Sequence, residues 1–305
     1  MFKRFAISIV LSSFFLVNSA YAAKPKILKK TELKPGTPAI GFTVFRGTEP
    51  ERFEVILGEV FDLAGIDLIT ARIHGGPFPL APLEKVGPIA AMSGSPVYIN
   101  CHNYDDCQDN GILVGAVSIR PESFIISGDN AYITPAEDMG GTKSFRYLSR
   151  ETFQRFGLIP LESISPILPI FDAQNSGATY DSCKQLADKD LKAGSMISVY
   201  AIRGDLPVYA SGTVTWRDGN HIYAFGHSLT GSGRVLFTFF QSRVVTTIQS
   251  LAHPFKVTGC PVGNEGAIIL DGSREIVGIV GLQIKHIDFK FTLNTGSSIH
   301  TLNSH

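Results

Sequence analysis

Beyond its first residues the sequence has no long apolar run, little helical periodicity and no excess of charge of either sign. A membrane-spanning helix needs about 20 consecutive apolar residues, so no integral membrane segment is expected once the leader has been removed. Twenty-seven basic residues balance 27 acidic ones, which gives no sign of the basic surface that recruits nucleic acid. No HExxH or comparable spacing of metal ligands occurs, so neither a metal nor a cofactor is expected.

The apolar stretch that the sequence does have lies at its start. Two basic residues precede the run Phe5–Val17, and Ala20-Tyr21-Ala22 supplies the small-x-small pattern of a cleavage site. Residues 1–22 are therefore predicted to be a signal peptide, with the protein exported to the periplasm or the extracellular space. The alternative of an uncleaved anchor is disfavoured, because the run is shorter than the ~20 residues that a spanning helix needs. The mature chain carries 25 basic and 27 acidic residues.

The sequence has four cysteines, which in an exported chain favour disulfide bonds. Cys101 and Cys107 flank a short polar stretch, so we expect them to be joined to each other across a loop tip. Closing so short a loop contributes about 2 kcal/mol in the chain-entropy model. Cys183 and Cys260 are left over, and the sequence leaves their pairing open.

Short runs of β-type pattern recur between turn signals, and the 30 glycines and 17 prolines favour strands joined by turns over helices. Asp218-Gly219 is a strong hairpin signal between two such runs. Only Phe145–Phe156 and Ser182–Leu191 have a helical pattern. The predicted strands include Ala39–Phe45, Phe53–Val60, Asp67–Ile73, Ile112–Ile119, Ile197–Ile202, Val208–Trp216, Ile222–Phe225, Val235–Ile248 and Ile276–Val280.

A weak internal repeat predicts two related β-domains. Leu33–Gly36 leads into Gly41–Gly47, and about 157 residues later Leu191–Gly194 leads into Val199–Gly204. The alternative is chance similarity between two β-hairpins. The predicted organisation is a signal peptide, an N-terminal β-domain, a linker with short helices, a C-terminal β-domain and a tail, at residues 1–22, 23–140, 141–190, 191–285 and 286–305.

Ser93 lies in a turn of small residues, Ala91-Met92-Ser93-Gly94-Ser95-Pro96, between two apolar segments. A nucleophilic serine needs a tight turn that presents its hydroxyl and aims backbone N–H groups at the oxyanion of a tetrahedral intermediate. Small residues permit such a turn. A Ser-Gly-Ser-Pro turn between strands is also a common structural element, so this pattern alone leaves both interpretations open.

His227 follows Tyr223-Ala224-Phe225-Gly226, just past the end of a predicted hairpin strand. A neutral imidazole at this rigid edge could take the proton of a serine hydroxyl within hydrogen-bond reach. The alternative is a structural histidine. His221 and His253 have similar positions, but neither has a glycine directly beside it.

The motifs around both residues resemble those of one family. Met92–Pro96 with the downstream Ile112–Val117 resembles the nucleophile segment of the SpoIVB peptidase family, whose members are serine peptidases related to the chymotrypsin-like double β-barrels. Gly212–Thr215 with Ala224–His227 resembles the histidine segment of the family. Further family-like segments are Ile133–Met139 and Asp271 with Gly278–Gly281, so that the resemblance spans most of residues 36–282.

The resemblance implies an all-β fold of two packed six-stranded barrels, 23–140 carrying Ser93 and 191–285 carrying His227, with a partly helical linker between them. It also implies Ser93 as the nucleophile, His227 as the general base, and an oxyanion hole formed by the N–H groups of Ser93 and Ala91. The implied substrate is a protein or peptide.

The sequence departs from the family pattern in three respects. The serine segment precedes the histidine segment, which implies a circular permutation. Ala91 stands where a glycine is usual, so the backbone conformation of the oxyanion hole carries a strain cost. The stretch Ile73–Phe78, where the family has its acid, contains none. Asp67, which opens a predicted strand, and Asp271, which follows His227 in the same domain, are the two alternatives for that acid.

The sequence therefore predicts an exported serine endopeptidase that acts through a Ser93 acyl-enzyme in the cleft between two barrels. A catalytically inactive binding or assembly module with the same fold is the alternative, since fold does not imply function. A third interpretation is a chain that cleaves only itself or a tethered partner.

Overall fold

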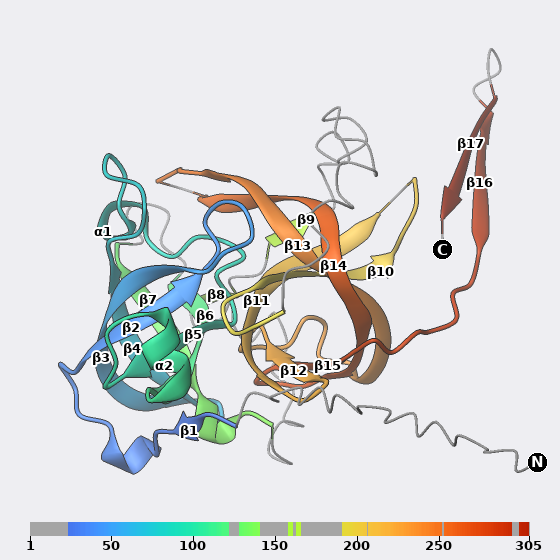
Figure 1. Cartoon of the computed structure of the whole chain (residues 1–305). Coiled ribbons are helices and arrows are strands. Elements are labelled where there is room, and N and C mark those ends of the chain that lie inside the picture. Colours follow the sequence, from blue (N-terminus) through green and yellow to red (C-terminus); the bar gives the residue numbers. More distant parts are fainter. Residues whose placement is uncertain are drawn as a thin grey trace, which may run out of the picture.

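The protein forms two β-barrels that lie side by side (Figure 1). The computed structural model describes residues 24–121, 128–140, 158–160, 163–165, 191–205, 207–251, 253–294 and 299–304. The predicted signal peptide, Cys183 and the predicted helix Phe145–Phe156 lie outside these residues, as does the predicted helix Ser182–Leu191 except for its last residue.

The first barrel is a closed sheet of six antiparallel strands in the order β2-β3-β4-β7-β6-β5, with β5 pairing back to β2. Closure pairs both edges of the sheet and removes the unpaired strand edges that an open sheet presents. Its strands are β2 (Pro38–Thr43), β3 (Glu51–Leu63), β4 (Ile66–His74), β5 (Ser95–Ile99), β6 (Ile112–Pro121) and β7 (Asn130–Pro135).

The second barrel closes in the same order, β10-β11-β12-β15-β14-β13, with β13 pairing back to β10. When the strands of each barrel are numbered in chain order, both barrels close in the order one, two, three, six, five and four. The strands are β10 (Met196–Ile202), β11 (Val208–Asp218), β12 (His221–Ala224), β13 (Gly233–Ile248), β14 (Phe255–Asp271) and β15 (Ile276–Val280). The predicted all-β fold of two six-stranded barrels is confirmed.

The internal repeat is reproduced in the hydrogen bonds at the entrance to each barrel. Gly36 has a φ of 83° and donates its N–H to Leu57 O at 2.7 Å; Gly194 has a φ of 84° and donates to Val214 O at 2.7 Å. In both copies the turn leads into the first strand, which pairs antiparallel with the second. A non-glycine side chain disfavours this left-handed conformation, which accounts for the glycine at both positions.

Each barrel has its own apolar core, and a third cluster joins the barrels. Trp216 of β11 packs with side chains of the first barrel, among them Phe42, Tyr98 and Met139. A smaller cluster across the same boundary contains Ala91 and Met196, together with Val44 and Val244. The two barrels therefore share a packed seam.

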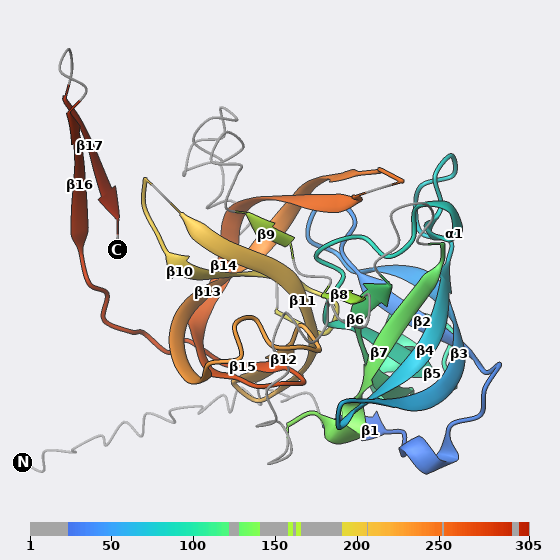
Figure 2. The same cartoon turned by 180° about the vertical axis from the view of Figure 1, so that it is seen from behind.

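The remaining elements lie around the barrels. Strand β8 pairs with β6 of the first barrel, whereas β9 pairs with β11 of the second. A C-terminal hairpin of β16 and β17 extends beside the second barrel (Figures 1 and 2), where the sequence predicted only a tail. It is bound to the β10–β11 connection, where Asp205 donates its N–H to Asn303 O at 2.9 Å. These elements are β1 (Lys26–Ile27), η1 (Lys30–Glu32), α1 (Leu83–Val86), α2 (Tyr104–Asp109), η2 (Ala136–Asp138), β8 (Leu158–Pro160), β9 (Ser163–Ser165), β16 (Phe289–Asn294) and β17 (Ile299–Ser304).

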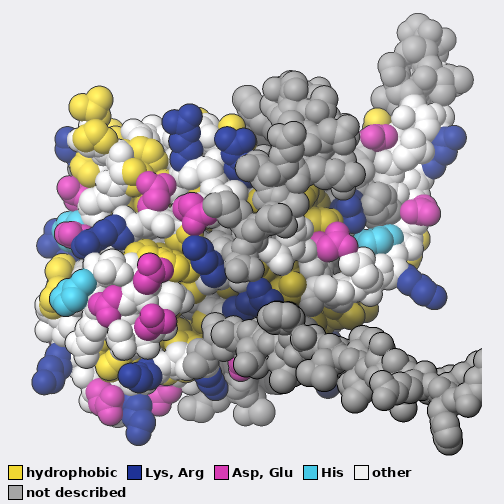
Figure 3. All heavy atoms as spheres, viewed as in Figure 1, with side chains coloured by type: hydrophobic (Ala, Val, Ile, Leu, Met, Phe, Trp, Pro, Cys, Tyr) yellow, Lys and Arg dark blue, Asp and Glu magenta, His cyan; other side chains and the backbone are white. Residues whose placement is uncertain are grey.

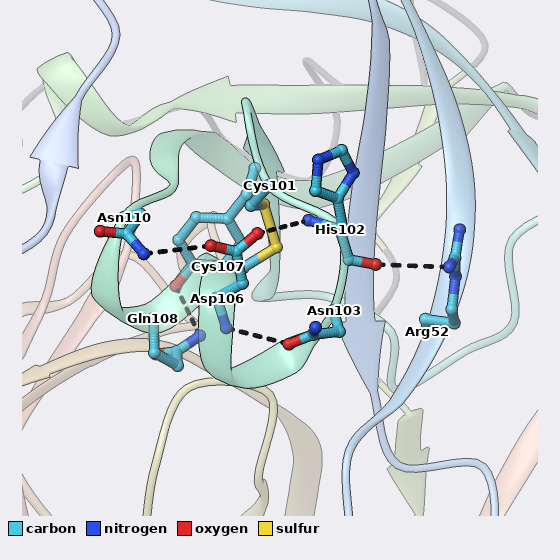
Figure 4. The surroundings of a disulfide bond; sticks show 9 residues. Arg52, Cys101, His102, Asn103, Asp106, Cys107, Gln108 and Asn110 are labelled. Atoms are coloured by element: carbon cyan, nitrogen blue, oxygen red, sulfur yellow. Dashed lines mark hydrogen bonds between the residues drawn. A yellow bond between two sulfur atoms is a disulfide. The ribbon is translucent and has the colours of Figure 1, made fainter.

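The predicted Cys101–Cys107 disulfide is present, but the second cysteine lies within the helix α2 and not on a loop tip (Figure 4). Asn103 caps this helix by accepting the N–H of Asp106 at 3.0 Å. The Asp106 carboxylate in turn accepts the N–H of His102 at 2.8 Å. A helix of six residues is too short to give a recognisable apolar period in the sequence.

Within the described part of the chain, the structure contains no helix of the length and apolarity needed to span a bilayer.

Replacing Cys101 and Cys107 together by serine should lower the free energy of unfolding by about 2 kcal/mol, because the open loop regains conformational entropy in the unfolded chain. Urea denaturation with and without a reductant measures this effect. The reductant should weaken the wild-type protein and leave the double variant unchanged. Equal unfolding midpoints for the oxidised wild type and the double variant would contradict the expectation.

Candidate active site

Ser93 and His227 occupy equivalent positions in the two barrels. Ser93 lies in the connection from β4 to β5, the third and fourth strands of the first barrel. His227 lies in the connection from β12 to β13, the third and fourth strands of the second barrel. The shared strand order therefore places the two predicted catalytic residues in corresponding turns.

The Ser93 turn is built from local hydrogen bonds and two left-handed residues. Ala91 has a φ of 75° and Gly94 a φ of 88°. The N–H of Ser95 donates to Met92 O at 2.9 Å, and its hydroxyl donates to the same oxygen at 2.6 Å. The N–H groups of Ala91 and Ser93 donate to no atom among the described residues. These are the two groups that the sequence predicted for an oxyanion hole.

The turn is docked on β11 of the other barrel. Thr213 donates its N–H to Ser93 O at 2.7 Å, and Thr215 donates its hydroxyl to Gly94 O at 2.9 Å. The approach is close, because a Cβ added to Gly94 would lie 1.8 Å from the carbonyl oxygen of Thr213. Only glycine fits this position.

The Ser93 hydroxyl is fully buried and has no hydrogen-bond partner among the residues that the structure describes. It points towards β11, where a Cβ added to Gly212 would lie 3.0 Å from the Ser93 Oγ. A buried polar group without a partner costs roughly 1–3 kcal/mol. Such groups are rare in folded proteins and each calls for an explanation, one of which is catalysis.

The His227 turn docks on the first barrel in the reciprocal way. Phe225 and Gly226 have φ values of 69° and 70°. The hydroxyl of Thr134 on β7 donates to Gly226 O, and the Gly226 backbone lies against Ala116 and Ser118 of β6. A left-handed phenylalanine is strained, so the tertiary contacts hold this turn in place.

His227 is 1 % exposed, and its Nδ1 lies 2.7 Å from the carbonyl oxygen of Ser228. A carbonyl oxygen can only accept a hydrogen bond, so this contact assigns the proton of the neutral imidazole to Nδ1. Nε2 then carries the lone pair. This is the tautomer that a general base requires.

The two turns meet at one residue of β11. Thr213 donates its N–H to Ser93 O, and its carbonyl accepts the N–H of Phe225 at 3.2 Å, two residues before His227. The predicted hydrogen bond from the Ser93 hydroxyl to His227 is not formed in this structure, since that hydroxyl has no partner among the described residues. The fold thus brings the two turns together without a hydrogen bond from the Ser93 hydroxyl to a described residue.

Asp271, at the end of β14, holds the loop that follows His227. Its carboxylate accepts the N–H groups of Leu229, Thr230 and Gly231, each at 2.7 Å. The Thr230 hydroxyl donates to it as well, at 2.6 Å. The structure gives this aspartate the role of an anchor for the loop that carries His227.

Asp67 lies at the start of β4, near the β3–β4 turn of the first barrel. Its carboxylate accepts a hydrogen bond from the Lys30 ammonium at 2.6 Å, and Lys30 also binds Asp138 at 2.7 Å. The structure therefore places Asp67 in an ion-pair network at the N-terminal segment.

A buried lysine lies behind the Ser93 turn, and the sequence analysis missed it. Lys256 of β14 is 2 % exposed. Its Nζ donates to the Thr43 hydroxyl at 2.6 Å and to Ala91 O at 3.3 Å. Burial lowers the pKa of Lys256 well below its ordinary value of 10.5, against a weaker opposing effect of the Glu51 charge.

Alternation within β14 could have placed Lys256 and Thr258 on one face of the strand, opposite Phe255 and Val257. A face with lysine and threonine is normally assigned to solvent, whereas here both side chains are buried. Lys256 is covered by Thr43 and Ala91 of the first barrel, whereas Thr258 contacts Ser211 of its own barrel, and strand periodicity shows neither contact.

Among the described residues, no group of three or more His, Cys, Asp or Glu side chains is placed to hold a metal ion. No protein-family model, no curated protein and no solved structure matches the chain. Membership of the SpoIVB peptidase family therefore remains a hypothesis based on the motifs around Ser93 and His227.

Replacing Gly94 by alanine should destabilise the protein by at least ~3 kcal/mol, because left-handed strain is added to a backbone clash with Thr213. Gly36→Ala is the matched control: its φ of 83° is similar, but nothing lies within 4 Å of the added Cβ. The control should cost only ~1 kcal/mol. Chemical denaturation of both variants measures the difference, and equal losses would contradict the close contact at Thr213.

Lys256 should make stability depend on pH. Between its lowered folded-state pKa and 10.5, the unfolded chain binds the proton that the folded chain does not, so stability rises with pH across this window. The slope reaches at most about 1.4 kcal/mol per pH unit. The variant Lys256→Met should lack this dependence of stability on pH. Unfolding free energies of both proteins from pH 7 to 10.5 test this, and parallel curves would show that Lys256 titrates normally.

Proposed function

We propose that the protein is an exported serine-type peptidase with Ser93 as the nucleophile and His227 as the general base. The observation that carries the proposal is the Ser93 hydroxyl, buried without a hydrogen-bond partner among the described residues, in a turn whose two candidate oxyanion N–H groups also make no bond there. The resemblance of both turns to the SpoIVB peptidase motifs supports the same roles.

In the proposed reaction, Nε2 of His227 takes the hydroxyl proton as the Ser93 Oγ attacks the carbonyl carbon of a peptide bond. The N–H groups of Ala91 and Ser93 stabilise the negative oxygen of the tetrahedral intermediate. His227 then returns the proton to the leaving amine, and an acyl-enzyme remains on Ser93. Water, activated by the same imidazole, releases the acid product.

The Ser228 carbonyl takes over one task of a catalytic acid. It accepts the proton of Nδ1 and so holds the imidazole in the useful tautomer. It carries no charge, and it stabilises the imidazolium of the transition state less than a carboxylate does. Asp271 supports the arrangement by anchoring the adjacent loop. Of the two aspartates predicted from the sequence, Asp271 is the better placed for an electrostatic contribution.

The enclosure of the site favours a second candidate function. Ser93 is 0 % and His227 1 % exposed, so no substrate reaches them without a conformational change. A binding or assembly module that keeps the peptidase fold would have such a closed site. A peptidase would have to open it on contact with its substrate.

Two features support export. The N-terminal residues have the pattern of a signal peptide. The Cys101–Cys107 disulfide is of the kind that persists in oxidising compartments. On the face shown in Figure 3, basic and acidic side chains are interspersed, which agrees with a protein or peptide substrate better than with a nucleic acid.

A fluorophosphonate probe should label the folded wild-type protein at Ser93 when an unfolded protein substrate is present to open the site. Ser93→Ala should abolish labelling, and His227→Ala should slow it by ~10²–10⁴-fold, the usual contribution of a general base. Ser250→Ala, in the β13–β14 connection, is the matched control and should label like the wild type. Intact-protein and peptide mass spectrometry locate the adduct.

Labelling that persists in Ser93→Ala would show that another residue reacts. A folded wild-type protein that stays unlabelled, alone and with unfolded protein substrates present, would reject the peptidase and leave the binding module.

A further inference from the structure

Lys256 holds two successive peptide groups of the turn that carries Ser93. Its backbone N–H donates to Ala90 O at 3.2 Å, and its side-chain Nζ donates to Ala91 O at 3.3 Å. Ala90 is fixed from its other side as well, because its N–H donates to Pro254 O at 2.9 Å. The start of β14 thus runs beside the turn as a short parallel bridge.

These two bonds determine the conformation of Ala91. The Ala90 carbonyl and the Ala91 N–H belong to one trans peptide group and point in opposite directions. Because the Ala90 carbonyl is bound to the Lys256 N–H, the Ala91 N–H points away from β14. The Ala91 carbonyl is bound to the Lys256 amine, so the peptide groups on both sides of Ala91 are held, and with them both of its backbone angles, including its φ of 75°. Alanine does not favour this conformation unaided.

We propose that Lys256 is the positioning residue of the oxyanion turn: its amine holds Ala91 in the left-handed conformation in which the Ala91 N–H is available to the substrate. The inference rests on the proposed peptidase function for its catalytic consequence, and on the geometry alone for its conformational part. Lys256 does not touch the substrate in this role.

A closed ring of hydrogen bonds supports the role. Lys256 Nζ donates to the Thr43 hydroxyl, which lies 3.1 Å from the Thr213 hydroxyl. Thr213 donates to Ala91 O at 3.1 Å, the same oxygen that Lys256 binds. The same amine also lies 3.6 Å from the Met196 Sδ, a weaker acceptor than the two oxygens. Burial lowers the pKa of Lys256, which favours the neutral form.

A lysine with only a packing role would behave differently. Burying an amine is costly, and an apolar side chain of similar volume usually replaces a buried polar group without loss of stability. Methionine has nearly the length of lysine and adapts to its surroundings. A packing role therefore predicts that Lys256→Met keeps the turn and its reactivity.

The experiment compares Lys256→Met with the double variant Lys256→Met/Ala91→Gly. Lys256→Met should slow fluorophosphonate labelling of Ser93 by ~10–10²-fold, because the Ala91 N–H no longer points at the oxyanion. For hydrolysis of an unfolded protein substrate, kcat should fall by the same factor with KM unchanged. Glycine adopts a positive φ without strain, so Ala91→Gly should restore both to within about threefold. Thr213→Val removes the other donor to Ala91 O and should give the same loss and the same rescue. Lys285→Met, at an exposed lysine, is the control.

A crystal structure of Lys256→Met gives a readout independent of activity. The φ of Ala91 should leave the left-handed region, and a retained φ near 75° would overturn the inference whatever the labelling rate. A loss of reactivity that Ala91→Gly does not rescue, with a lowered melting temperature, would assign Lys256 a purely structural role. If the wild type never labels but Ala91 moves in Lys256→Met, the peptidase proposal fails and the positioning role stands.

Discussion

Thr213 of β11 is the residue on which the joint between the two barrels depends. Its N–H holds the Ser93 carbonyl, its hydroxyl holds the Ala91 carbonyl, and its own carbonyl receives the Phe225 N–H. One strand residue of the second barrel thus fixes the serine turn of the first barrel and the turn that leads to His227. Because backbone groups make most of these bonds, the geometry depends on strand register more than on side-chain identity.

Polar contacts stabilise the seam, and the same two turns that make these contacts contain strained backbone and an unpaired hydroxyl. Ala91 and Phe225 both have positive φ values, and the Ser93 hydroxyl is buried without a partner among the described residues. Each feature costs of order 1–3 kcal/mol. Among the described residues, two of the four non-glycine residues with a positive φ lie in these two turns, beside the unpaired Ser93 hydroxyl. Strain and unpaired polar groups gather at functional sites, where the surrounding structure holds them.

The two barrels repeat one topology, and their equivalent turns differ in sequence. Gly36 and Gly194 keep the same conformation and the same hydrogen bond at the entrance of each barrel. The connections between the third and fourth strands differ: one carries Ser93 and the other His227. Two copies of a barrel packed against one another thereby supply two different functional groups to a shared seam.

The sequence by itself determined the two β-domains and the disulfide, because strand alternation, the repeated glycine turns and the short spacing of Cys101 and Cys107 are local signals. It also made Ser93 and His227 candidates, through the small residues of their turns and through the resemblance of both turns to the SpoIVB peptidase motifs. Only the tertiary structure decided that Thr213 joins these turns and that Lys256 is buried behind them. Those contacts link residues more than one hundred positions apart, and they bury a lysine that its residue type assigns to the surface. No local pattern encodes which face of β14 the other barrel covers.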